Sequence, residues 1–199
     1  MPQNLSDQGT IKGSLNLPSG TTFSPNTLTV QSPITNGSVN NGNYNVTAFL
    51  NTHTTEFVVN TNQDVIMMGY HYPGQTNSDI SAASTALALV MNSQSIIFLS
   101  DAGKKTMAEK VLSDVKFPDL VSTVEASIKL NKNIFDETND LLLQQVSDVF
   151  TSASRRTQQT QAADAVLINK VGSTLNFQNN SNANSAVVGI YKEIGRAHV

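Results

Sequence analysis

SAASTALALVM, at Ser81–Met91, opens the part of the chain that decides the fold. Its apolar residues, and those of three later segments, recur every three or four positions, which is the period of an α-helix. These segments are Ser81–Met91, Asp101–Val115, Pro118–Leu130 and Asn139–Ala153. Because the connections between them are short, neighbouring helices are expected to pack antiparallel. The sequence therefore predicts a central bundle of about four helices within residues 78–154.

The ends and faces of these segments support the helical prediction. Ser100 stands where an N-cap belongs, and Pro118, followed by Asp119, suits the first turn of a helix. Apolar stripes should pack against neighbouring elements. The stripes are Met107, Val111, Leu112 and Val115; Leu120, Val121, Val124 and Ile128; and Leu142, Val146, Val149 and Ala153.

The stretch before the helices, residues 9–76, has the pattern of an antiparallel β-sandwich. Turn residues separate its short apolar runs, and Asn36-Gly37 and Asn41-Gly42 predict tight turns because Asn and Gly tolerate positive φ angles. The expected strands are Thr10–Leu17, Leu28–Val30, Asn43–Leu50, Glu56–Asn60 and Asp64–Tyr70. Together with the helices, these strands predict an α+β fold class.

The region after the helices reads as a polar linker and then a second β segment. Residues 155–161 are the linker, and residues 162–192 hold three expected strands, so this part is interpreted as the start of a truncated β module. The last residues, Ile194–Val199 (IGRAHV), resemble the translation of a sequencing-library adapter. We therefore expect residues 193–199 to be an artefact and the native chain to continue beyond about Lys192.

Composition excludes several classes of function. The 199 residues carry a formal net charge of −3 and only 14% charged residues, so nucleic-acid binding is not expected. No apolar run approaches the roughly 20 residues of a membrane span, and no cysteine is present to form disulfides. Met1–Gly9 lacks the pattern of a signal peptide. That start fits a cytoplasmic protein, or a frame that begins inside a longer gene.

Three short motifs, in order, resemble the carboxypeptidase-regulatory or transthyretin-like β-sandwich. They are Gly9–Gly13 (GTIKG), Leu28–Val30 (LTV) and Asn41–Val46 (NGNYNV), and the resemblance covers residues 9–72. The chain departs from the family at Asn41, where the family has Asp, and it lacks the family's Pro-hydrophobic-Ala step. This resemblance implies a stabilising or docking appendage without catalytic residues.

The sandwich pattern followed by Ser84–Met91 (STALALVM), and then by a Phe117-Pro118-Asp119 step, is similar to exported bacterial proteins of unknown function. This second resemblance implies that the chain is secreted or lies at a cell surface. A cytoplasmic location is the alternative.

Catalytic and metal sites find little support in the sequence. His71, Asp79 and Ser84 could make a triad on paper, but no G-x-S-x-G motif is present, and a Ser-rich chain offers such sets by chance. No phosphate-binding loop occurs, and His53 and His71 have no metal-ligand partner at helical spacing. We expect no enzymatic activity, no cofactor and no metal.

Tyr70, His71 and Tyr72 form the candidate binding site. Aromatic side chains beside a polar ring, at the junction of the sandwich and the helices, could form a shelf for a sugar or peptide. In the alternative interpretation, one Tyr packs the sandwich against the first helix while His71 points to water.

These observations predict a non-catalytic structural or adhesive fragment of a larger exported or cell-surface bacterial protein, whose partner would be a surface glycan or another protein. A carbohydrate- or peptide-binding module with its site at the sandwich–helix junction is the first alternative. The second is an accessory part of an enzyme whose catalytic domain lies elsewhere.

Overall fold

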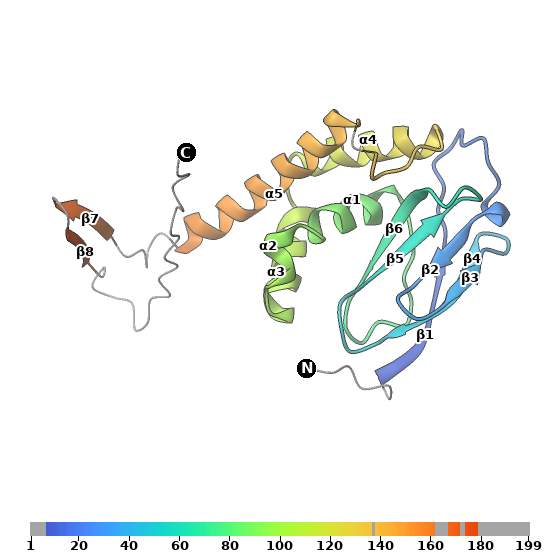
Figure 1. The fold of residues 1–199 in the computed structure, drawn as a ribbon, viewed down its shortest axis with the longest axis horizontal. Helices are drawn as coiled ribbons and strands as arrows, with labels where there is room; N and C mark the ends of the chain where they lie inside the picture. Colours follow the sequence, from blue (N-terminus) through green and yellow to red (C-terminus); the bar gives the residue numbers. More distant parts are fainter. Residues whose placement is uncertain (1–6, 137, 162–166, 172–173, 179–199) are drawn as a thin grey trace, which may run out of the picture. The chain divides into compact units, whose positions relative to one another are not determined.

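The computed structural model describes residues 7–136, 138–161, 167–171 and 174–178. It has an α+β fold, and the chain divides into two compact units, Met1–Ser154 and Arg155–Val199. The first unit contains antiparallel sheets and helices (Figure 1). The predicted fold class is therefore confirmed.

Two antiparallel sheets form the β-sandwich of the first unit. One sheet pairs β1 (Gln8–Ser14) with β4 (Asn43–Phe49), and the segment from Asn77 to Ile80 runs parallel to the other edge of β1. The second sheet has the order β3-β2-β5-β6. Its strands are β3 (Asn36–Ser38), β2 (Thr29–Gln31), β5 (Thr54–Val59) and β6 (Val65–His71).

One of the two predicted turns is confirmed and the other is wrong. Asn41 and Gly42 have φ angles of 50° and 77°, so they make the tight turn before β4. Asn36-Gly37 instead lies in β3, where Gly37 pairs with Val30. A Cβ at Gly37 would lie 2.1 Å from the backbone oxygen of Asn45, so this glycine permits β3 to approach β4 closely.

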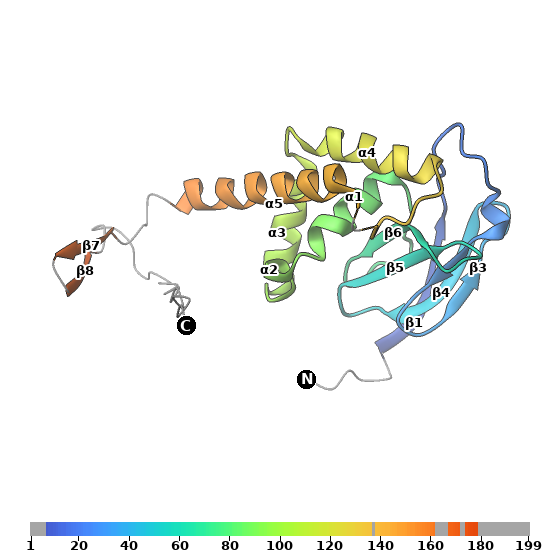
Figure 2. The same cartoon turned by 45° about the horizontal axis from the view of Figure 1, so that its top comes forward.

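Helices cover the sandwich at β6 and share its core (Figure 2). The described helices are α1 (Ala82–Met91), α2 (Gln94–Ile97), α3 (Asp101–Leu112), α4 (Phe117–Lys129) and α5 (Asp140–Gln161), of which α1 and α4 contact β6. Val30 and Val58 from the strands belong to the same apolar cluster as Leu87, Leu120 and Val149 from the helices. Burial of this shared cluster holds α1 and α4 against the sheet.

Most of the predicted helix-end signals are confirmed. The Ser100 side chain accepts a hydrogen bond from Gly103 N at 3.2 Å and caps α3, as predicted. The stripe on α3 is wrong at its end, because the helix stops at Leu112, which is 51% exposed, and Val115 is 81% exposed. Helix α5 continues to Gln161, through residues 155–161 that were expected to form a linker.

The second unit contains a hairpin of β7 (Leu167–Val171) and β8 (Thr174–Gln178), where strands were expected. The third expected strand, residues 186–191, and the suspected artefact, residues 193–199, lie outside the described residues. In the part of the chain that is described, no helix is both long enough and apolar enough to span a membrane.

Candidate functional site

Alternation along β6 separates the three residues that were predicted to form the site. Tyr70 and Tyr72 lie on one side of the strand, with ring centroids 5.3 Å apart and ring planes at 86°. His71 lies on the opposite side, within the sandwich, and has no solvent exposure. The structure therefore brings the two tyrosines together and removes His71 from their surface.

His53 takes the place beside the tyrosines that had been expected for His71. Its ring centroid lies 5.5 Å from that of Tyr70 and 5.6 Å from that of Tyr72. Because Thr54 pairs with His71 across β5 and β6, the preceding residue, His53, faces Tyr72. Only the register of this hairpin could have revealed His53, which looks isolated in the sequence.

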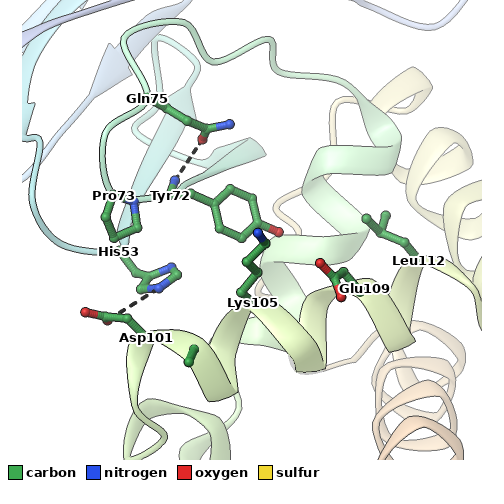
Figure 3. Close-up of a pocket in the computed structure, with 9 residues that line it drawn as sticks. His53, Tyr72, Pro73, Gln75, Asp101, Lys105, Glu109 and Leu112 are labelled. Carbon is green, nitrogen blue, oxygen red and sulfur yellow. Dashed lines mark hydrogen bonds and ion pairs between the residues drawn. The ribbon is translucent and has the colours of Figure 1, made fainter.

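A cavity of about 500 Å³, here called the junction pocket, opens beside these rings (Figure 3). One wall is the loop after β6, and the other is a face of α3 along which Asp101, Lys105 and Glu109 follow one another at intervals of four residues. The lining residues are His53, Tyr72, Pro73, Gln75, Asp101, Ala102, Lys105, Glu109 and Leu112.

Internal hydrogen bonds hold the loop wall of the pocket. The His71 Nε2 atom lies 2.5 Å from the backbone oxygen of Gln75, and Tyr72 N donates to Gln75 Oε1 at 2.8 Å. Gly74 N donates to the backbone oxygen of Leu50 at 2.7 Å, and its φ of 82° suits glycine. His71 thus supports the pocket from behind, although it does not line it.

The rings of the pocket are neutral at neutral pH. Burial lowers the pKa of His53, and this effect outweighs the neighbouring Asp101 carboxylate, whose Oδ1 lies 3.4 Å from His53 Nε2. Apart from this contact with Asp101, neither ring nitrogen of His53 has a hydrogen-bond partner. Burial, and then the nearby Glu109, raise the pKa of Tyr72. The pocket therefore combines uncharged rings with two carboxylates and one ammonium group.

The residues of the possible triad do not meet. His71 Nε2 contacts Gln75, whereas Asp79 Oδ1 accepts hydrogen bonds from Ser14 N and Oγ at 2.8 and 2.7 Å. The Ser84 hydroxyl caps α1 and donates to the backbone oxygen of Met68. Over the described ranges, no group of three or more His, Asp or Glu side chains could hold a metal ion.

A comparison of this chain with models of known protein families, with curated proteins and with solved structures yields no match. The resemblance of residues 9–72 to the transthyretin-like sandwich stays a prediction. Function is therefore inferred from the junction pocket.

Proposed function

We propose that this chain is a non-catalytic binding module whose ligand occupies the junction pocket. The observation that carries this proposal is the lining of the pocket. Half-buried Tyr72 and His53, whose side chain is 4% exposed, stand opposite a helix face that carries Asp101, Lys105 and Glu109. A volume of about 500 Å³ is within the range of roughly 300–1,000 Å³ typical of small-ligand sites.

The composition of the pocket supports binding over catalysis. No serine, threonine or cysteine is among the described residues that line it, so the lining lacks the side chains that most often act as alcohol or thiol nucleophiles. Pro73, Ala102 and Leu112 add apolar surface around the charged groups. Mixed apolar and polar linings of this kind orient a ligand through a few placed polar contacts.

An adhesive role in a larger exported or cell-surface protein agrees with such a site. This setting follows from the sequence resemblance to exported proteins. The module would attach its parent protein to a glycan or a peptide through the junction pocket. An accessory role beside a separate catalytic domain would use the same pocket for substrate attachment.

A panel of immobilised glycans and peptides, probed with the full chain, tests the proposal. We expect a saturable signal that is lost in Tyr72→Ala, because this change removes an aromatic wall of the pocket. Leu130→Ala, at an exposed position outside the pocket lining, should bind like the unmodified chain. Thermal unfolding checks that both variants fold, and a flat response over the whole panel would refute the proposal.

A further inference from the structure

We infer that the ligand of the junction pocket is a short neutral carbohydrate, a step that rests on the proposed binding function. One apolar face of a sugar ring would pack near Tyr72, and its hydroxyls would meet Asp101, Lys105 and Glu109 on α3. Figure 3 shows the Tyr72 ring extending from the loop wall toward Lys105 and Glu109.

An extended peptide would find few free backbone groups to pair with at this site. A peptide that adds to a sheet needs unpaired N–H and C=O groups along a strand edge. In the loop wall, Tyr72 N, Gly74 N and Gln75 N all donate within the protein, and His71 engages the oxygen of Gln75. Further along β6, Thr85 and Ser84 of α1 already bond the backbone of Met68.

The helical wall instead offers its side chains for contact with a ligand. Asp101, Lys105 and Glu109 lie one helical turn apart, at a rise of roughly 6 Å per step, and alternate between acceptor, donor and acceptor. A carboxylate can only accept hydrogen bonds, so the ligand must supply donors to two positions and an acceptor between them. Neighbouring sugar hydroxyls do both, because each O–H donates and its oxygen accepts.

The rings and the charges narrow the ligand class further. Tyr72 is held at steep angles against Tyr70 and His53, at 86° and 71°, so it offers a pre-ordered surface with little entropy to lose. The axial C–H groups of a pyranose form an apolar face that suits such a ring. Two carboxylates against one Lys give the lining a net negative charge, which repels uronic and sialic acids.

Calorimetric titration of the full chain decides the ligand class. The probes are neutral oligosaccharides ending in glucose, galactose, mannose or N-acetylglucosamine, their sialylated or uronic counterparts, and uncharged peptides. We expect a neutral glycan to bind, and Glu109→Gln to weaken it by roughly 10-fold through the loss of a charged acceptor. The matched control Glu125→Gln, on α4 and outside the lining, should bind unchanged.

The outcomes separate this inference from the proposed function. Binding of peptides or acidic glycans alone, abolished by Tyr72→Ala, would overturn the carbohydrate inference and leave a binding module. A neutral glycan that binds equally to Glu109→Gln, Asp101→Asn and Tyr72→Ala would overturn the placement in the junction pocket. No binding by any probe class would overturn both.

Discussion

The Glu56 side chain places a carboxyl group inside the β-sandwich. It has no solvent exposure, its Oε1 makes no hydrogen bond, and its Oε2 accepts from the Ser78 hydroxyl at 3.4 Å. Burial raises the pKa of Glu56 to about 7. Ser78 also accepts, at its backbone oxygen, a hydrogen bond from the Tyr44 hydroxyl, so this group lies where the segment from Asn77 to Ile80 meets the sheets.

Protonation of Glu56 makes stability depend on pH. The pKa is higher in the folded state than the ordinary 4.5, so the stabilisation is complete below about pH 4.5 and is lost as pH rises through 7. The glutamine side chain in Glu56→Gln cannot ionise. The free energy of unfolding of this variant, relative to that of the unmodified chain, should therefore grow as pH rises over this range, by up to roughly 3 kcal/mol. Urea unfolding at pH 5, 6, 7 and 8 measures the difference, and a constant difference would contradict the argument.

His71 is expected to hold the pocket loop in place. His71→Ala removes a buried ring and leaves the Gln75 oxygen without its partner, so the free energy of unfolding should fall by roughly 2–4 kcal/mol. The rate of amide hydrogen exchange at Gly74 and Gln75 should rise by more than the rate in α4. Unchanged exchange in the loop would show that Leu50 and Tyr72 suffice to anchor it.

At the level of the elements, α1 protects the free edge of β6. The Thr85 hydroxyl is buried, accepts from Met68 N at 3.0 Å and donates to the backbone oxygen of Ser81 at 2.8 Å. An exposed strand edge would otherwise leave such groups open to pairing with another chain.

Thr85→Val tests this edge contact with an almost isosteric change. It leaves Met68 N buried and unpaired, so we expect a loss of roughly 1–3 kcal/mol in urea unfolding. Thr106→Val on α3 is the matched control, because Thr106 is exposed and its hydroxyl bonds only the backbone oxygen of Ala102. Equal effects of the two substitutions would contradict a role for Thr85 at the sheet edge.

At the level of the whole molecule, the strands and helices of the first unit, Met1–Ser154, share a large hydrophobic core cluster. The sequence predicted separate modules at residues 9–76 and 78–154, and those boundaries stay a prediction. The core cluster joins Val30 of the sandwich with Leu120 of α4, which has no solvent exposure. A shared core favours unfolding in one cooperative step.

Leu120→Ala should therefore destabilise both regions together. We expect a loss of roughly 2–5 kcal/mol, with amide protection falling equally in β5 and α4. Leu130→Ala, 66% exposed at the end of α4, should cost far less. Protection that falls in α4 alone would instead support separate sandwich and helical modules.

The sequence by itself determined the features that depend on neighbouring residues. Helical periodicity located α1, α3 and α4, Ser100 capped its helix, and Asn41-Gly42 made its turn, because dihedral preferences and local hydrogen bonds act within a few positions. The prediction that the apolar stripe continues to Val115 is wrong, because periodicity cannot tell where a helix stops.

Only the tertiary structure decided the candidate site. The pairing of β5 with β6 put His53, and not His71, beside Tyr70 and Tyr72. Packing of α3 opposite the loop then supplied the charged wall. Likewise, Gly37 makes no turn but allows its strand to approach the backbone of Asn45 closely. These contacts join residues far apart in the chain, and strand register and helix packing depend on burial of the whole core, which no short stretch of sequence encodes.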